Sequence, residues 1–435
     1  MMSEGEIQRR LGLLLRTGCL LMESGADTSR VMRTMKRVAA YMGLQLERLN
    51  IYIVYNMLMV NLSDCRQSFT RFQRVERHGI NLDTLRQVSH LSCEAQRTGY
   101  SLDYYERQLS QIACQRRNYS PWQVAVGGGL ACGGFCIQFG SDWTAFFYAA
   151  LAAILGLRLR MWLGAVGSNA LVNTSVAAFV STLIACAFSE LSQWTSVSGG
   201  LMSIFASSTP WHPLLACALF IVPGVPLINF VSDMLSGYTQ VGVTRAMGTL
   251  TTLLAMAFGI AFAIQVCGID NFAKDLPMTP HHAYDEYSLA AAVSAIGFSM
   301  IFNTPRHLMG FVALGGVVSV CTRNFVNLGP SSGNIGLDLG LVVGSFVGSA
   351  VVSILCCALV RWLHTPHQLL SIPSVIPMIP GVLMYRALFA FINMHGVVGE
   401  VTVAMNYAIQ ASLIILFIAL GVAIPNVFFR RMIPA

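Results

Sequence analysis

The feature that most constrains this chain is the uneven distribution of its charged side chains. Residues 1–120 carry 28 of the 47 charged residues, and the remainder of the 435-residue chain carries only 19. Soluble domains normally contain about 25% charged residues, whereas this chain contains 11%. The chain therefore combines a charged soluble domain, residues 1–120, with a long apolar part that favours a membrane.

The charged segment predicts a compact α+β domain. Helices are expected at about 5–23, 28–42, 81–97 and 101–117, with Asp27, Asn81 and Ser101 as N-caps. Between them, residues 45–55, 57–62 and 68–75 have strand-like composition. We expect no signal peptide at the N-terminus, and the first long apolar run begins after Trp122. We expect the domain to stay in the cytosol.

The apolar part predicts ten membrane spans. They are expected at about 122–140, 144–157, 164–188, 213–231, 246–267, 288–303, 308–322, 336–360, 369–392 and 400–428. The loops on one side would contain seven arginines: Arg158, Arg160, Arg245, Arg306, Arg361, Arg430 and Arg431. The other side would contain only Lys274 and Arg323. This asymmetry predicts that both termini lie on the cytosolic side of the cell (inner) membrane.

A short motif recurs in the two halves of the apolar part. The segment Val222–Ile228 reads VPGVPLI, and residues 379–385 read IPGVLMY, in the fourth and ninth spans. Two units of five spans follow, residues 121–268 and 287–431, and an odd number of spans inverts the second unit. The predicted fold is an all-α membrane protein with ten transmembrane helices as two inverted five-helix repeats, preceded by the small cytosolic α+β domain.

The repeated Pro-Gly pairs are the first candidate site. Pro223-Gly224 and Pro380-Gly381 lie inside apolar runs, where proline breaks the helical ladder of hydrogen bonds. Broken helices at membrane depth need cover from protein or a water-filled cavity. Their half-helix N-termini would suit a substrate carboxylate. The alternative is a packing kink.

Polar residues inside or beside the spans complete the candidate site. The candidate substrate-binding residues are Asn169, Asn173, Asn229, Asn303 and Arg386. The candidate proton carriers are Asp233, Asp338 and Glu400. Arg386 would bind a substrate carboxylate directly or pair with a buried carboxylate such as Asp338. The alternative role for the asparagine amides is hydrogen bonding between helices. The alternative for Asp338 and Glu400 is a solvated position at the end of a span.

Other functional classes lack their sequence signals. Gly127-Gly128-Gly129 has no following G-K-[ST], so it is not a P-loop. His281-His282 with Asp285 and Glu286 favours a solvated loop over a metal site, and the cysteines form no C-x-x-C pair. We expect no enzyme activity, cofactor, metal or nucleic acid. A membrane-bound hydrolase or a sensor that uses residues 1–120 is the alternative of another class.

Several motifs together carry a family resemblance. They are Glu23–Arg30 with the helix to Gly43, the helices between Asn81 and Tyr119, Val222–Asn229, Phe302–Arg306 and Ile376–Gly381. Because these motifs occur in this order along the chain, it resembles the threonine/serine exporter family. Members of that family join a cytosolic domain to ten transmembrane helices in two related parts. The resemblance implies proton-coupled export of threonine and serine.

Related two-protein systems look like dicarboxylate (succinate) exporters, which is the alternative within transport. The expected partners are a small carboxylate or amino-acid substrate, protons and the lipid bilayer. The sequence leaves undecided whether the protein forms a homo-oligomer.

Overall fold

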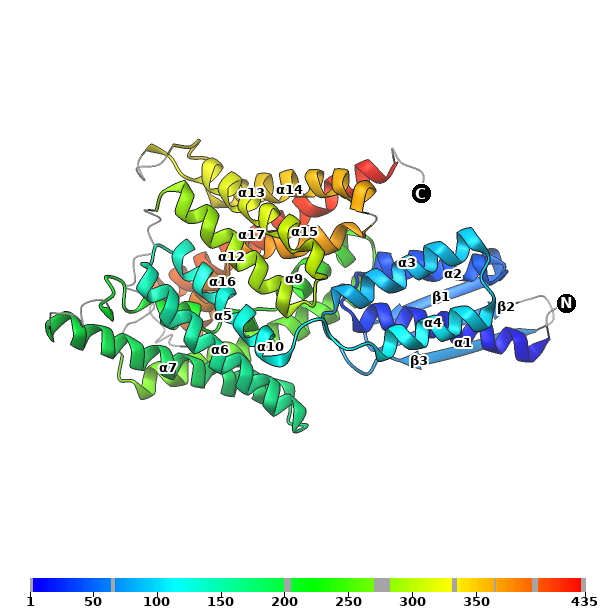
Figure 1. Ribbon diagram of the computed structural model, residues 1–435, viewed down its shortest axis with the longest axis horizontal. Coiled ribbons are helices and arrows are strands. Elements are labelled where there is room, and N and C mark those ends of the chain that lie inside the picture. Colours follow the sequence, from blue (N-terminus) through cyan, green and yellow to red (C-terminus); the bar gives the residue numbers. More distant parts are fainter. Residues whose placement is uncertain are drawn as a thin grey trace.

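The computed structural model of the chain describes residues 3–63, 67–198, 205–269, 282–330, 335–363, 365–392 and 398–431. The N-terminal domain and a larger helical bundle lie end to end, with the chain passing into the bundle near residue 120 (Figure 1).

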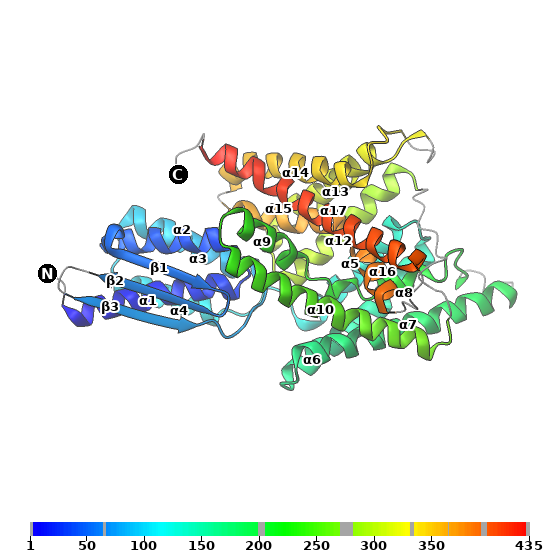
Figure 2. The same cartoon turned by 180° about the vertical axis from the view of Figure 1, so that it is seen from behind.

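The N-terminal domain is a three-stranded antiparallel sheet covered on one face by helices. Strands β1 (Leu49–Val54), β2 (Met57–Ser63) and β3 (Ser68–Arg74) pair in chain order. The helices are α1 (Glu4–Glu23), α2 (Thr28–Tyr41), α3 (Leu82–Thr98) and α4 (Leu102–Cys114). Figure 2 shows the strands in front and the helices behind them. The predicted strands are confirmed, and Asn81 and Ser101 cap α3 and α4 as expected.

The bundle follows the predicted order of apolar segments. Its first half contains α5 (Pro121–Gln138), α6 (Trp143–Ala165), α7 (Ala170–Ser198), α8 (His212–Ala216), η3 (Leu219–Ile221), α9 (Gly224–Leu235) and α10 (Thr239–Val266). Its second half contains α12 (Tyr284–Ile301), η4 (Arg306–Leu308), α13 (Met309–Asn327), α14 (Leu341–Leu363), α15 (His367–Val375), η6 (Ile376–Met378), α16 (Gly381–Ile392) and α17 (Val398–Arg431).

Six helices of the described residues are long and apolar enough to cross a membrane, or eight if each of two bent pairs counts as one span. The bends are 59° between residues 212–221 and 224–235, and 53° between 367–378 and 381–391. Both bends fall at the repeated Pro-Gly pairs, so the predicted helix breaks at Pro223 and Pro380 are present. The remaining two predicted spans correspond to α5 and α12, which are not among the eight.

Helices α5 and α12 form the close-packed centre of the bundle. A Cβ atom on Gly297 of α12 would lie 2.4 Å from the carbonyl oxygen of Gly127 on α5, and one on Gly134 would lie 2.6 Å from the Ala290 oxygen. Glycine lets the two backbones touch, as small residues do in membrane helix pairs. Most of α5 is buried in protein, so its side chains need not be as apolar as those that face lipid.

The two halves of the bundle repeat the same pattern of neighbours. Helix α5 packs on α6 as α12 packs on α13, and α7 packs on α10 as α14 packs on α17. The half-helices after the bends follow the same rule, because α9 packs on α10 and α17, and α16 packs on α17 and α10. These matched neighbours accompany the repeated Pro-Gly motif of the two halves.

Several predicted loop residues lie inside helices, which corrects the predicted span boundaries. Arg158 and Arg160 belong to α6, Arg245 to α10 and Arg323 to α13. The helices continue beyond the apolar runs because their ends pack against other parts of the protein; Arg158, for example, lies over the Trp122 ring at 5.2 Å. Lys274 lies outside the described residues.

We predict that Gly297→Ala destabilises the protein by about 1–3 kcal/mol, because the new methyl group meets rigid backbone of α5. Gly248→Ala on α10 is the matched control, since a Cβ there has nothing within 4 Å. Thermal unfolding of the detergent-purified variants measures the difference. Equal unfolding temperatures for the two variants would contradict the close contact of α5 and α12.

Candidate functional site

The N-terminal domain contacts the bundle through the turn between α1 and α2. The Thr28 backbone N–H, the first of α2, donates to Asp233 Oδ1 on α9 at 2.8 Å. The other carboxylate oxygen of Asp233 lies 3.2 Å from Nε of Arg245 on α10. Asp233 is 0% exposed and Arg245 is 5% exposed. A carboxylate from the bundle thus meets the positive end of the α2 dipole and a buried cation.

Asp27 occupies the N-cap position of α2 but does not cap it, which corrects the sequence prediction. Its carboxylate instead accepts from Gln368 Nε2 on α15 at 2.7 Å. The Gln368 carbonyl oxygen in turn accepts from Arg30 Nε at 2.7 Å. The amide therefore lies between an anion and a cation, and all three side chains are buried.

Two further bundle residues bind the carbonyl groups of the same turn. Asn229 Nδ2 on α9 donates to the Gly25 oxygen at 2.8 Å, and Arg245 donates to the Ala26 oxygen at 3.3 Å. The Arg245 guanidinium also lies 5.6 Å from the centre of the Tyr55 ring. One short turn thus satisfies polar groups from α9, α10 and α15, which otherwise would be buried without partners.

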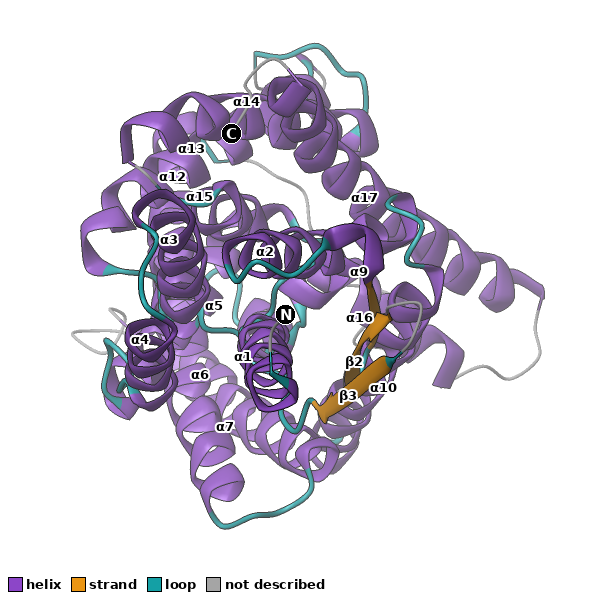
Figure 3. Cartoon of the chain, turned by 90° about the vertical axis from the view of Figure 1, so that its right-hand side faces the viewer, coloured by secondary structure: helices purple, strands orange, loops and turns teal. Residues whose placement is uncertain are grey.

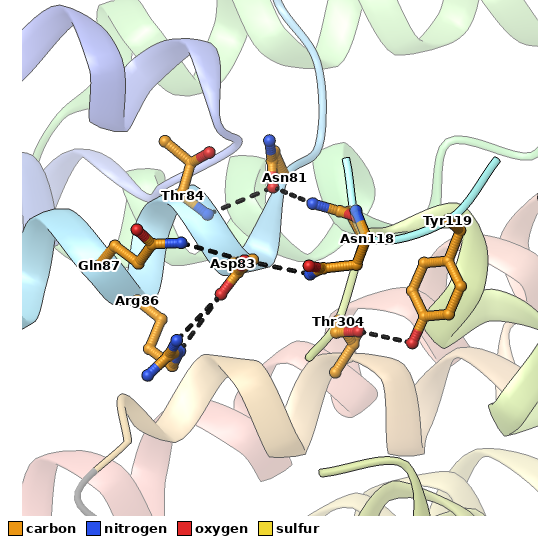
Figure 4. Close-up of polar contacts among 9 residues, drawn as sticks. Asn81, Asp83, Thr84, Arg86, Gln87, Asn118, Tyr119 and Thr304 are labelled. Carbon is orange, nitrogen blue, oxygen red and sulfur yellow. Dashed lines mark hydrogen bonds and ion pairs between the residues drawn. The ribbon is translucent and has the colours of Figure 1, made fainter. Parts of the chain in front are cut away.

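A second polar contact joins the domain to the segment after α12. Asn303 donates to Asn81 Oδ1 at 2.7 Å and accepts from the Asn118 backbone N–H at 2.8 Å. Its φ of 56° is a left-handed conformation that asparagine tolerates. Figure 4 shows the Asn118 side chain donating to Asp83, and the Tyr119 hydroxyl donating to the Thr304 carbonyl oxygen. Asn303 therefore holds the domain in place.

A cavity of 590 Å³ lies between the N-terminal domain and the bundle. Its wall combines the first turns of α2, the half-helices α9 and α15, and α17. Figure 3 views the molecule from the side of the N-terminal domain and shows α2 in front of the bundle. The polar lining residues are Asp27, Ser29, Arg33, Lys36, Asn229, Ser232, Ser236, Tyr238, His367 and Gln368. The volume is typical of sites for small molecules.

The cavity wall carries both signs of charge and titratable groups. Arg33 and Lys36 come from α2, and Asp27, just before α2, accepts from Gln368 of α15. His367 is buried, with its ring nitrogens 3.2 Å from the hydroxyls of Ser353 and Ser371. Burial raises the pKa of Tyr238, and the nearby Arg33 guanidinium opposes the shift. These groups can bind carboxylate and ammonium groups and exchange protons.

The two Pro-Gly breaks meet each other deeper in the bundle. A Cβ on Gly224 would lie 2.5 Å from Ile376, and one on Gly381 would lie 2.7 Å from Leu219, so each break packs into the other half-helix pair. The space left at this junction is 10 Å³, with an apolar lining. That is room for about one water molecule. Of the predicted residues Pro223, Gly224, Pro380 and Gly381, both glycines line this junction and none lines the cavity.

The remaining predicted site residues lie apart from the cavity. Asn169 accepts from the Leu171 N–H at the start of α7, and Asn173 donates to the Ser168 oxygen, so both organise the turn between α6 and α7. Asp338 is exposed and precedes α14, which places it in a loop and not in the predicted span.

Arg386 of α16 lies over the Tyr407 ring of α17 at 5.7 Å. Glu400 is two turns before Tyr407 on the same helix. Neither residue lines the cavity.

Sequence reasoning missed Gln368, Arg245 and the α2 side chains as site residues. Arg245 is an arginine inside a long apolar helix, which is a recognisable signal. It was placed in a loop because the predicted span began at residue 246. His282 also differs from the prediction, because it is 9% exposed and bonds Glu286 and the Ser141 oxygen instead of lying in a solvated loop. His281 lies outside the described residues.

Apolar helices, two broken helix pairs and a polar cavity under a soluble domain form the architecture of a membrane transporter. Two family models match the chain: one described as putative threonine/serine exporter over residues 12–267, and one described as Threonine/Serine exporter, ThrE, over residues 287–428. The chain belongs to the threonine/serine exporter family.

Two curated relatives represent different parts of this family. The probable succinate transporter subunit YjjP of Escherichia coli is 28% identical over 261 residues, which cover 59% of this chain and 94% of that protein. The threonine/serine exporter of Corynebacterium glutamicum is 21% identical over 430 residues, which cover 97% of this chain and 83% of that protein. No solved structure matches the chain.

We predict that Asp233→Asn lowers stability by about 3–5 kcal/mol, because Arg245 is left buried without its carboxylate. The double variant Asp233→Asn/Arg245→Gln should recover part of the loss, since neither charge of this buried pair remains. Asp338→Asn, at an exposed carboxylate, is the control. Thermal unfolding measures all of these variants. An equal loss in the single and double variants would mean that the two charges are not coupled.

Proposed function

We propose that the protein is a secondary transporter that exports small hydroxy amino acids, threonine and serine, from the cytosol. The observation that carries the proposal is the 590 Å³ polar cavity, whose wall includes a half-helix from each broken pair. Broken helices at a repeat interface are a common way to build a transporter site. The cavity would receive substrate on the cytosolic side, beneath the N-terminal domain.

We propose further that the bundle crosses the inner membrane ten times as two inverted five-helix repeats. The repeated order of neighbours and the matched bends support this arrangement. In it, α5 and α12 are the two central spans, and both termini are cytosolic. The packed junction of Gly224 and Gly381 would then close the path beyond the cavity, as one end state of alternating access requires.

A dicarboxylate is the second candidate substrate. Arg33 and Lys36 line the cavity together, whereas its acidic residue Asp27 is held by Gln368. Two cations suit two carboxylates, and one relative is named a probable succinate transporter subunit. Because of these two cations, a dicarboxylate is a second substrate to test, in addition to the amino acids.

The substrate is decided by counterflow in proteoliposomes that contain the purified protein. We expect uptake of labelled threonine or serine against unlabelled internal threonine, with succinate as the competing candidate. Liposomes without protein are the control. Exchange of succinate alone would select the dicarboxylate function, and no exchange of any of the three would reject transport of these substrates.

We propose that the proton gradient drives export, because the sequence has no nucleotide-binding motif. His367 and Tyr238 are titratable groups in the cavity wall, and Asp233 lies directly behind it. A protonophore should abolish uphill efflux from cells, while downhill counterflow in proteoliposomes continues. Uphill efflux that survives the protonophore and follows ATP instead would exclude proton coupling.

A further inference from the structure

We propose that Arg33 and Lys36 bind the carboxylate of the substrate, so that the N-terminal domain supplies part of the binding site and sets its preference for acids. This inference rests on the proposed transport function. It assigns the domain a direct role in the transport path, which a separate soluble module would not have.

The geometry places the two cations on the same wall. Positions 33 and 36 are three residues apart in α2, so their side chains leave the same face of the helix. Both line the cavity, together with Asn229 and Ser232 of α9 and Gln368 of α15. Helix α2 is fixed in that position because its first N–H donates to Asp233 and its preceding turn binds Asn229.

Asp27 acts on Arg33 electrostatically without forming an ion pair with it. Among the described residues, neither Arg33 nor Lys36 forms an ion pair, and Asp27 is bonded to Gln368, which also binds Arg30. Arg33 Nε donates to the Ser29 oxygen of its own helix at 3.1 Å. That bond steadies the side chain and leaves the N–H groups of both terminal nitrogens for a ligand.

This arrangement distinguishes substrates by their charged groups. The Arg33 guanidinium can hold one carboxylate with two parallel hydrogen bonds, and the Lys36 ammonium adds a point charge beside it. A dicarboxylate would use both cations. An amino acid would place its carboxylate on Arg33 and its ammonium toward Asp27, which lines the cavity just before the same helix. An uncharged polar molecule gains nothing from either residue.

The test compares Arg33→Gln and Lys36→Gln with Arg107→Gln in the counterflow assay. Arg107 is a matched control, because it is an exposed arginine of the same domain whose Nε also donates to the carbonyl four residues earlier. We expect each cavity variant to raise the KM about tenfold with little change in maximal rate. Arg107→Gln should match the wild type, and Lys36→Arg should restore most of the affinity.

Membrane abundance and unfolding temperature are measured for every variant, so that a folding defect is not read as weak binding. A wild-type KM in both cavity variants would overturn the inference while leaving transport intact. An inactive wild type would instead reject the proposed function.

Anionic lipid headgroups could engage the same cations. The assay is therefore repeated in phosphatidylcholine vesicles without anionic lipid. A KM effect that persists there supports substrate binding. An effect that disappears assigns the two cations to the lipid surface and overturns the inference.

Discussion

The structure depends on one buried carboxylate. Asp233 lies between the Arg245 guanidinium and the first N–H of α2, and it is fully buried. An isolated charge there would be strongly unfavourable, so α9, α10 and α2 must meet for any of them to be stable. This requirement fixes the N-terminal domain against the half-helix that follows the first Pro-Gly break. The cavity exists because the domain is held at that position.

Glycine determines how the bundle itself is packed. Gly127 and Gly297 bring α5 and α12 into backbone contact, and Gly224 and Gly381 let the two broken helix pairs cross. In a membrane the hydrophobic effect does not drive helices together, so close packing of small residues has to contribute. The same breaks expose polar side chains at one end of the bundle and leave an apolar contact at the other. In the proposed transport path, the cavity would be the open part and the packed junction would close the path beyond it.

The N-terminal domain is joined to the bundle by buried polar contacts. Its turn of residues 24–27 supplies carbonyl groups and a helix N-terminus to the bundle, and α2 supplies cavity cations. The family match spans the junction of both parts, residues 12–267. The first N–H of α2 is capped by Asp233 of α9, so the domain cannot move away without uncovering that carboxylate.

The sequence by itself determined the division into a charged domain and an apolar bundle, the three strands, and the two helix breaks. These follow from local composition and from the missing N–H of proline, which act wherever the chain goes. It also indicated Asn229 as a candidate site residue, because an amide in an apolar run needs a partner. Only the tertiary structure decided the partners: Asp27 leaves its cap for Gln368, Asp233 takes over that end of α2, and Arg33 and Lys36 enter the cavity wall. Those contacts join residues more than 180 positions apart, and no local pattern encodes which buried charge will meet which helix end.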